Sequence, residues 1–352
     1  MKFIKNYNIH DILKFRIIRN KEHNLRDLIN LKFSFFNVEE LDDLDIILNI
    51  GKFTPSNMDC YLVDHKYYIK ENYLYCRDSE GKATWDVEIS GLKDKTIIIN
   101  FNGEIKGFQS LMNSDFVAQN LLLRLMEYKF AGKQYYFAHS AGISKGKQAH
   151  VFAGRGGTFK TSLCMDFVRR AGFEFLGDDR VILHRDKVLN FPMGLRVFSF
   201  MCDNLPNENS WNLAKKGKFA KHLWETRKEK YSTIEISKSA KLKSLLLIAK
   251  TNSKTITVRE ISSKEVVDRL AANNRLEDFV SLGGLGINSG PHLKYMLAYS
   301  YIFPDSYIAK SQEESKKIIR DIVENIPIYE VEVPSKYSLS YFNKIHELVK
   351  NA

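Results

Sequence analysis

A glycine-rich stretch that ends in a lysine and a threonine is the part of the sequence best suited to chemistry. Residues 154–161 read GRGGTFKT, preceded by the apolar run HVFA and followed by a helical pattern. Between a strand and a helix, main-chain N–H groups and the positive end of the helix dipole bind phosphate oxygens. Lys160 would add positive charge at the β- and γ-phosphates, and the Thr161 hydroxyl would bind Mg²⁺. The pattern predicts a nucleotide site.

The predicted nucleotide contacts cover the whole loop and the first helical turn. They are Gly154, Arg155, Gly156, Gly157, Thr158, Phe159, Lys160, Thr161 and Ser162. Phe159 stands where such loops normally have their last glycine, and an aromatic residue at φ > 0 is costly. The loop could still form if this position adopts φ < 0, and the ring could then pack outward or stack on the adenine. A glycine-rich turn without a ligand is the alternative interpretation.

Two adjacent acids follow the next apolar run, FEFLG. Asp178 and Asp179 stand where a neighbouring strand of a phosphate-loop sheet delivers its carboxylates to the metal. Adjacent side chains on an extended chain point in opposite directions, so the two acids can have different roles. One can bind Mg²⁺ while the other accepts the proton of an attacking hydroxyl. A turn or a helix cap would also account for the pair.

A histidine precedes the loop by fifteen residues. If the runs 135–143 and 148–153 pair across a turn centred on Lys145 and Gly146, His139 lies opposite Phe152. One strand spacing, about 4.8 Å, would then separate His139 from the chain that enters the phosphate site. A purely structural histidine is the alternative.

The flanking sequence predicts the strands and helices that would position these residues. We predict strands in 134–143 and 148–154, a turn at 144–147, and an amphipathic helix over 160–171 that ends at Gly172. A strand, the acidic pair and a second strand follow in 173–183. Further along we predict strands at 244–249, 255–261 and within 326–334, and helices from Ser263, over 312–325 and over 338–350.

The N-terminal third has a different character. Short β-type runs at 60–69, 72–78 and 95–103 are separated by turn residues, and a helix is predicted over 116–130. We divide the chain into a mostly β accessory domain, residues 1–108, and a catalytic domain, residues 109–352. The basic segment 215–230 is predicted to be a loop or exposed helix that could hold an acidic substrate. The glycine segment 281–291 is a connector or a lid.

The ordered set from His139 to Leu183 resembles the catalytic domain of HPr kinase/phosphorylase and its kinase-like relatives, a class related in fold to phosphoenolpyruvate carboxykinase. The family pattern has a His about fifteen residues before the loop GxSGxGKS, then a helix that ends in Gly and a strand that closes on DDxV. Here Asp178-Asp179-Arg180-Val181 closes the pattern. The likeness is good over 139–183 and loose over 116–335. Phe159 departs from the family glycine.

The resemblance implies an α/β (mixed α+β) fold and an ATP- and Mg²⁺-dependent kinase. The γ-phosphoryl group would pass to a hydroxyl, expected to be a serine, of a peptide, a protein or a small molecule. Lys160 would bind phosphates, and His139 would lie beside the transferred phosphate. We assign Asp178 as the base and Asp179, with Thr161, as the metal ligands, and the two acids could exchange roles. Arg155 and Arg180 are candidate charge stabilisers.

Two other functions fit parts of the same pattern. The stretch GRGGTFKT partly matches the deviant loop of partitioning and septum-site ATPases, KGGxGK[ST], with Arg155 in place of the signature lysine. A catalytically degenerate scaffold that binds a nucleotide or a peptide is the second alternative, and Phe159 favours it.

Composition limits which kinds of partner the chain is expected to bind. The 352 residues carry 53 Lys and Arg against 42 Asp and Glu, a net charge of +11, which suits an anionic ligand. No run approaches the ~20 apolar residues that a membrane span needs, and four dispersed cysteines suggest no zinc site or disulfide framework. We expect a cytoplasmic protein with no membrane partner. Nucleic acid ranks last among the partners, and a homo-oligomer is allowed.

Overall fold

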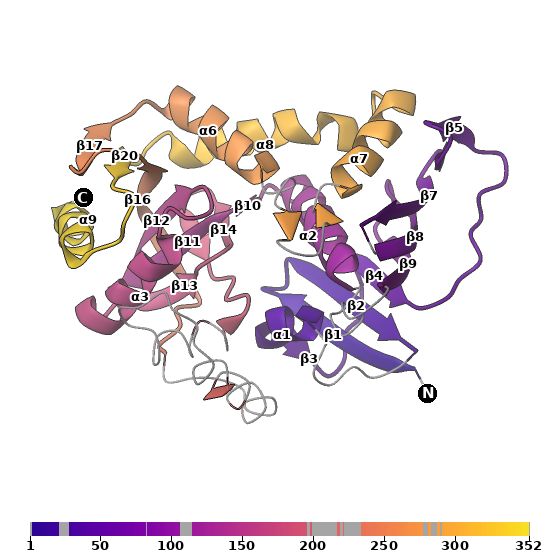
Figure 1. Cartoon of the computed structure of the whole chain (residues 1–352), viewed down its shortest axis with the longest axis horizontal. Helices are drawn as coiled ribbons and strands as arrows, with labels where there is room; N and C mark the ends of the chain where they lie inside the picture. Colours follow the sequence, from indigo (N-terminus) through magenta and orange to yellow (C-terminus); the bar gives the residue numbers. More distant parts are fainter. Residues whose placement is uncertain are drawn as a thin grey trace. The chain divides into compact units, whose positions relative to one another are not determined.

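The computed structural model describes residues 2–20, 28–81, 83–105, 115–195, 198, 217–218, 221, 234–276, 281–282, 287–288 and 291–351. The chain divides into two units, and each unit is assembled from two stretches of sequence. Unit 1 comprises Met1–Lys133 and Arg275–Glu314, and unit 2 comprises Gln134–Asn274 and Ser315–Ala352. The fold is of mixed α/β type with a mostly β N-terminal region, as the sequence predicted (Figure 1).

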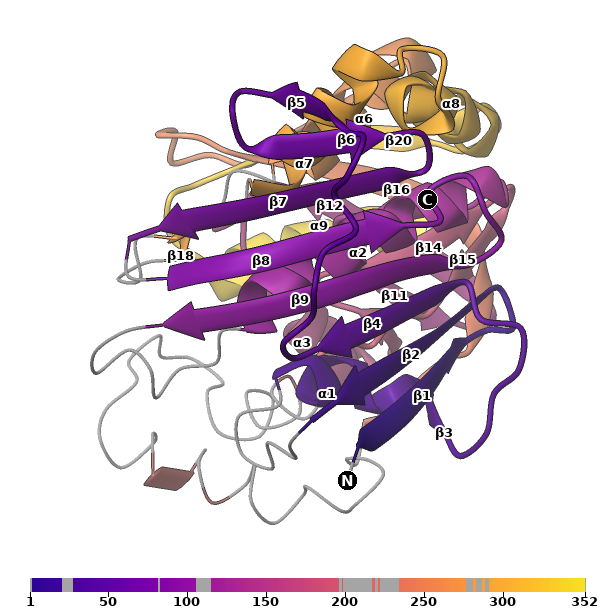
Figure 2. The ribbon, with the colours of Figure 1, turned by 90° about the vertical axis from the view of Figure 1, so that its right-hand side faces the viewer.

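Unit 1 is built on one mixed sheet with the strand order β3-β1-β2-β4-β9-β8-β7-β6-β5 (Figure 2). Its strands are β1 (Phe3–Ile9), β2 (Leu13–Arg19), β3 (Asn37–Val38), β4 (Ile46–Ile50), β5 (Tyr61–Val63), β6 (Tyr67–Lys70), β7 (Tyr73–Glu80), β8 (Ala83–Ser90) and β9 (Ile97–Ile105). β2, β4 and β9 run parallel, and the other neighbours are antiparallel. Leu13, Phe15 and Ile17 alternate with less buried residues, so one face of β2 is core.

Helices cover this sheet and close its core. They are α1 (Leu28–Phe33), the 3-10 turn Ser34–Phe36, α2 (Asp115–Gly132) and α7 (Pro291–Ile302), and the short strands β18 (Ser281–Leu282) and β19 (Ile287–Asn288) pair with each other. α2 packs on α1, β2, β4 and α7, and its helical spacing is confirmed. The buried Trp85 indole donates to the Tyr295 hydroxyl of α7, 2.7 Å away, so residues 210 positions apart share one core.

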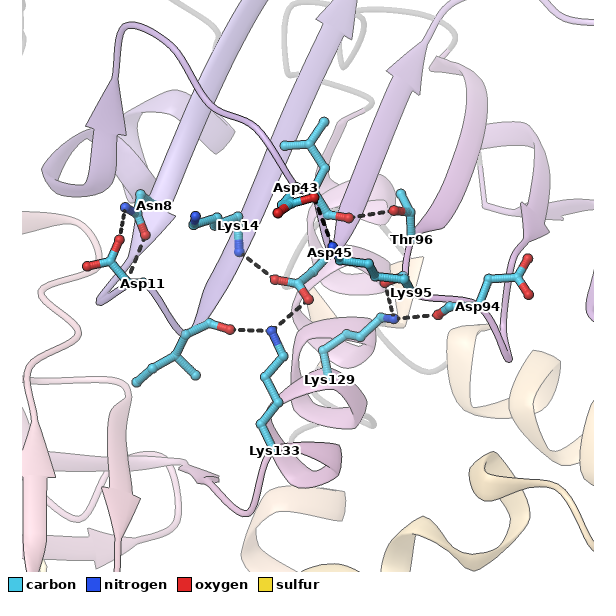
Figure 3. A network of polar contacts seen from close by, with 12 residues as sticks. Asn8, Asp11, Lys14, Asp43, Asp45, Asp94, Lys95, Thr96, Lys129 and Lys133 are labelled. Carbon is cyan, nitrogen blue, oxygen red and sulfur yellow. Dashed lines mark hydrogen bonds and ion pairs between the residues drawn. The ribbon is translucent and has the colours of Figure 1, made fainter.

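Polar contacts at the end of α2 fasten the helix to the loops beside the sheet (Figure 3). The Lys133 ammonium lies 2.7 Å from the Asp45 carboxylate, whose other oxygen accepts the Lys14 main-chain N–H at 2.9 Å. Lys129 donates to the main-chain carbonyls of Asp94 and Lys95. The side chain of Asp45 is largely buried, so the ion pair offsets the cost of burying its charge.

The predicted boundary near residue 108 differs from the observed division. α2 belongs with the N-terminal sheet rather than with the following unit, and the segment 275–314, predicted as part of the catalytic domain, belongs to unit 1. The reason is that apolar residues at helical spacing predict a helix but do not show which sheet the helix packs against. The run 60–69 is also two strands, because Asp64 and His65 turn the chain at φ 49° and 56°.

Unit 2 is built on a second mixed sheet with the order β10-β14-β15-β16-β12-β11-β13, and β20 joins β16 to β17. Its strands are β10 (Tyr136–Ala138), β11 (Ser140–Lys145), β12 (Gln148–Gly154), β13 (Glu174–Gly177), β14 (Val181–His184), β15 (Lys187–Leu189), β16 (Ser239–Lys250), β17 (Thr257–Glu260) and β20 (Ile328–Val333). β12, β16 and β20 run parallel. This unit also contains α3 (Lys160–Ala171), α9 (Leu339–Asn351) and nearly all of α6 (Ser263–Leu276), and the division between the units falls within α8 (Tyr307–Val323), after Glu314.

The predicted elements of unit 2 are largely confirmed, but the hairpin register is not. The run 134–143 is two strands separated at His139, and the turn residues are Gly146 and Lys147, both at φ > 0. Ser140 therefore pairs with Ala153, and Ala141, not His139, lies opposite Phe152. A type I′ hairpin turn needs φ > 0 at both central positions, and the sequence did not reveal that Lys147 accepts this conformation.

Candidate phosphate-binding site

The topology of unit 2 brings the predicted site residues to one edge of its sheet. β12 and β13 are both antiparallel to β11, so they run in the same direction. α3 connects them and packs on β11, β12 and β13. The carboxyl ends of β12 and β13 and the amino end of β11 therefore meet at a common edge. The loop after β12, the acids after β13 and His139 before β11 all stand there, although the predicted pairing of His139 was wrong.

Two positions in the loop after β12 require glycine, one because space is lacking and the other because of its backbone conformation. A Cβ on Gly154 would lie 2.5 Å from the Ile248 carbonyl oxygen and 3.0 Å from Thr158 Oγ1, so the close approach of β16 excludes a side chain. Gly157 has φ +81°, a left-handed conformation that glycine adopts at little cost. Thr158 is buried, and its hydroxyl donates to the Arg155 carbonyl at 2.7 Å.

Phe159 has φ 66° and ψ 20°, immediately before the first residue of α3. The loop therefore forms with a positive φ at this position, not with the φ < 0 that would avoid the cost of an aromatic residue there. Its ring contacts Tyr337 at 5.6 Å and Tyr341 at 6.3 Å between ring centroids, and Lys250 Nζ lies 4.9 Å from its centre. Local sequence disfavours φ > 0 for an aromatic residue, and these distant contacts override that preference.

Lys160 is the first residue of α3, and its side chain folds back over the loop. Its ammonium group donates to the Gly154 carbonyl at 2.5 Å and to the Arg155 carbonyl at 3.2 Å. Lys160 is only 7% exposed, so these carbonyls replace water around a buried charge. A cation therefore lies within the loop where the sequence predicts phosphate binding.

One of the two acids after β13, Asp179, contacts His139 and the residue that follows it. Asp179 Oδ1 lies 3.5 Å from His139 Nδ1, and the Asp179 carbonyl accepts the Ser140 main-chain N–H at 3.2 Å. Asp178 and Asp179 are both half-buried, in a bend at the end of β13. The bend places one of the two predicted acids directly beside the predicted histidine.

The environment of His139 keeps its imidazole neutral. Burial is the largest effect and lowers the pKa of His139 to about 3, against the opposing attraction of Asp179. Arg180, Lys160 and Arg155 also lower this pKa, since each adds positive charge nearby. At neutral pH the site therefore combines three cationic side chains, two adjacent carboxyl groups and an uncharged imidazole.

Two residues that the sequence did not single out hold this arrangement from α6. The Asn274 side chain accepts the His139 main-chain N–H at 2.8 Å and donates to the Phe137 carbonyl at 2.8 Å. The Asn273 side chain donates to the His139 carbonyl at 2.9 Å, and its main-chain carbonyl accepts from Arg155 at 3.0 Å. The available signal was a pair of adjacent amide side chains in the helix predicted to start at Ser263.

The candidate charge stabilisers are engaged with the protein rather than solvated. Arg180 is buried, with its guanidinium 5.1 Å from the centre of the Phe137 ring. Arg155 is held by the contact with α6 described above. Arg155 and Arg180 are thus fixed near the site, and their proximity contributes to the low pKa of His139.

The donor set suits a hard cation. Thr161 and Ser162 are half-buried in the first turn of α3, and Asp178 and Asp179 supply carboxylate oxygens at the same sheet edge. Hydroxyl and carboxylate oxygens are the ligands that Mg²⁺ prefers, and Mg²⁺ often takes only one or two protein ligands beside phosphate oxygens. Among the described residues, no three His, Cys, Asp or Glu side chains cluster as a metal site.

Two predicted substrate elements lie largely outside the described residues. The basic segment 215–230 is described only at Gly217, Lys218 and Lys221. The segment 281–291 is described at the paired strands β18 and β19 and at Pro291.

Comparison of the chain with protein-family models and with curated proteins returned no match. In the described part of the chain, no helix combines the length and hydrophobicity needed to cross a bilayer.

Proposed function

We propose that the chain is an ATP- and Mg²⁺-dependent kinase that transfers the γ-phosphoryl group to a hydroxyl of a peptide, a protein or a small molecule. One observation carries the proposal: the loop with Lys160, the Asp178–Asp179 pair and His139 meet at one edge of the unit 2 sheet. Phosphoryl transfer requires mainly positioning and the neutralisation of negative charge, and this edge offers both.

Lys160 is the proposed phosphate ligand. Its ammonium group exchanges the carbonyls of Gly154 and Arg155 for the β- and γ-phosphate oxygens of the nucleotide. Main-chain N–H groups around Gly157 and Phe159 complete the cradle, since residues that alternate between left- and right-handed conformations direct successive N–H groups at one anion. Arg155 and Arg180 add positive charge beside the transferred group.

The two acids have separate proposed roles. Asp178 accepts the proton of the acceptor hydroxyl as its oxygen forms a bond to the γ-phosphorus and the bond to the bridging oxygen breaks. Asp179 and Thr161 would hold Mg²⁺, which would supply positive charge beside the phosphates. His139 stays uncharged because it is buried, and it lies beside the transferred phosphoryl group.

The test is transfer of label from γ-labelled ATP to an acceptor. Candidate acceptors are a serine-containing peptide library, cellular protein and free serine, each with Mg²⁺. We expect labelled acceptor with the native chain and none with Lys160→Ala or Asp178→Asn. The matched control is Lys145→Ala: this exposed lysine donates to the Ala171 carbonyl at the end of α3 and lies over the Phe173 ring, so its loss should not change transfer.

The other outcomes identify the other functions. Inorganic phosphate released without any acceptor indicates an ATPase. A chain that fails to bind MgATP, with no rise in melting temperature at saturating nucleotide, contradicts both enzymes and indicates a scaffold.

A further inference from the structure

The left-handed conformation of Phe159 requires an explanation outside the loop. A non-glycine residue with φ 66° and ψ 20° is disfavoured, and such residues persist where the surrounding structure imposes the conformation. Phe159 also sits at the position where Lys160 and α3 begin. Any relaxation to φ < 0 would redirect the N–H groups around it and the start of the helix.

The contacts that hold Phe159 in this conformation come mainly from the C-terminal segment of the chain. Tyr337 precedes α9 and Tyr341 lies in its first turn, and both rings contact the Phe159 ring. The tyrosines contact each other at 5.1 Å, edge to face. Lys250 Nζ lies 4.9 Å from the centre of the Phe159 ring, a cation–π contact. The ring of Phe159 is therefore held by three side chains from two distant segments.

Tyr337 is itself hydrogen-bonded to α3, the helix that follows the loop. The Tyr337 hydroxyl donates to Asp166 Oδ2 at 2.7 Å, and Arg170 Nε donates to Asp166 Oδ1 at 2.7 Å. Asp166 is buried in α3, one and a half turns after Lys160. Tyr341 is 1% exposed, and its hydroxyl makes no hydrogen bond with the described residues, so its ring is the part that makes contact. These contacts connect the loop to the C-terminal segment, and the C-terminal segment in turn to α3.

We infer that Phe159, Tyr337 and Tyr341 form an aromatic clasp that keeps the loop in its phosphate-binding shape without the usual glycine, which makes the two tyrosines positioning residues for the nucleotide. This inference rests on the proposed nucleotide-binding function of the loop. Phe159 replaces the glycine that usually adopts the left-handed conformation before the lysine. The clasp makes up for this replacement, because tertiary packing holds Phe159 in that conformation.

A rescue experiment tests the clasp. Tyr337→Leu/Tyr341→Leu and Phe159→Ala both remove the ring contacts and leave a strained residue at 159. We expect each to bind MgATP roughly five-fold more weakly, the factor that corresponds to the glycine preference at a left-handed position. Phe159→Gly needs no clasp and should bind within about two-fold of the native chain. In the Phe159→Gly background the tyrosine substitutions should have no further effect.

Amide hydrogen exchange on the nucleotide-free chain gives the second readout. The clasp variants should exchange faster at residues 158–163, where Thr158 N–H bonds to the Arg155 carbonyl and Leu163 N–H to the Phe159 carbonyl. Phe159→Gly should restore slow exchange in the presence of the tyrosine substitutions. Tyr341→Phe keeps the ring, so it should behave as the native chain does, unlike Tyr341→Leu.

Phe342→Leu is the matched control for damage to α9. Phe342 is equally buried on the same helix but contacts Phe167 and His346 rather than Phe159. It should lower the melting temperature without selective loosening of the loop. Two results would overturn the clasp. One is that the tyrosine substitutions weaken MgATP binding equally with Phe or Gly at position 159, and the other is that Phe159→Ala exchanges its loop amides as slowly as the native chain. If the native chain binds no MgATP, the proposed function fails, while the exchange measurements still decide whether the clasp exists.

Discussion

The ammonium group of Lys160 lies 2.5 Å from the carbonyl oxygen of Gly154, six residues earlier in the chain. The lysine thus closes its own loop, and a phosphate that enters the loop competes with main-chain carbonyls for this cation. The contact keeps a buried charge hydrogen-bonded in the chain without nucleotide.

Replacing Lys160 removes the cation that would neutralise the transferred phosphoryl group. We expect Lys160→Ala to lower kcat/KM for phosphoryl transfer by roughly 100- to 1,000-fold, the usual effect of losing one charge-stabilising group. The melting temperature should no longer rise with MgATP. Single-turnover transfer and thermal unfolding with and without nucleotide check this, and transfer within about ten-fold of native would contradict the role of Lys160.

The two acids should respond differently to loss of charge. Asp178→Asn should lower kcat roughly 100-fold or more with an unchanged Mg²⁺ requirement, because a general base is lost. Asp179→Asn should raise the Mg²⁺ concentration needed for half-maximal transfer, because a metal ligand is lost. Mg²⁺ titrations of both variants distinguish the roles, and the reverse pattern would exchange the assignments of Asp178 and Asp179.

Three loop glycines should differ in their tolerance of alanine. Gly154→Ala places a Cβ 2.5 Å from the Ile248 carbonyl and should lower the free energy of unfolding by about 1–3 kcal/mol. Gly157→Ala meets open space but has φ +81°, so we expect a loss of about 1 kcal/mol. Gly156→Ala meets open space without a left-handed φ and serves as the neutral control. Urea unfolding of the three variants gives the order, and a stable Gly154→Ala chain is the contrary result.

A buried histidine away from the site should make stability depend on pH. Burial, with a smaller effect of Lys243, lowers the pKa of His150 to about 4, and its ring bonds to Ser244 Oγ at 2.8 Å. An unfolded histidine titrates near 6.5, so between about pH 6.5 and 4 only the unfolded chain takes up this proton. The stability contributed by neutral His150 is therefore complete above pH 6.5 and is lost as pH falls towards 4.

The matching variant is His150→Gln, which cannot be protonated. We expect it to reduce the slope of the free energy of unfolding against pH, between pH 6 and 5, by about 1.4 kcal/mol per pH unit. Urea unfolding at several pH values measures both slopes. Equal slopes for the native chain and the variant would show that His150 is protonated when folded.

Two lysines of unit 1 offer a comparison between a partly buried and an exposed ion pair. Lys133→Met leaves the largely buried Asp45 carboxylate without its cation and should cost about 1–3 kcal/mol (Figure 3). Lys95→Met breaks a pair with Asp43 in which both side chains are mostly exposed and screened by water, so the free energy of unfolding should hardly change. Urea unfolding compares the two, and similar small losses would show that the Asp45 pair does not stabilise unit 1.

Local patterns predicted most elements of unit 2 because their signals are local. The α3 boundaries follow from the spacing of Leu163, Cys164 and Phe167 and from Gly172, which is left-handed at the helix end. The strand–acids–strand pattern of 174–184 is confirmed for the same reason. The common edge shared by the loop, the acids and His139 could be anticipated once these elements were ordered along the chain.

What the sequence did not reveal depends on contacts far along the chain. The φ of Phe159 is set by Tyr337 and Tyr341, nearly 180 residues later, and the backbone of His139 is held by Asn273 and Asn274. Likewise, no local pattern shows that 275–314 returns to the N-terminal sheet. Periodicity reports that a face is buried but not its partner.

The hydrogen bond between Trp85 and Tyr295 has a consequence for synthesis on the ribosome. Domains tend to fold as units while the chain emerges, but the N-terminal sheet, whose last strand β9 ends at Ile105, lacks α7 until translation passes Pro291. Every strand of the unit 2 sheet except β20 has emerged by then. Nascent chains stalled before residue 291 should therefore leave the indole of Trp85 accessible to quenchers, and release of the full chain should protect it.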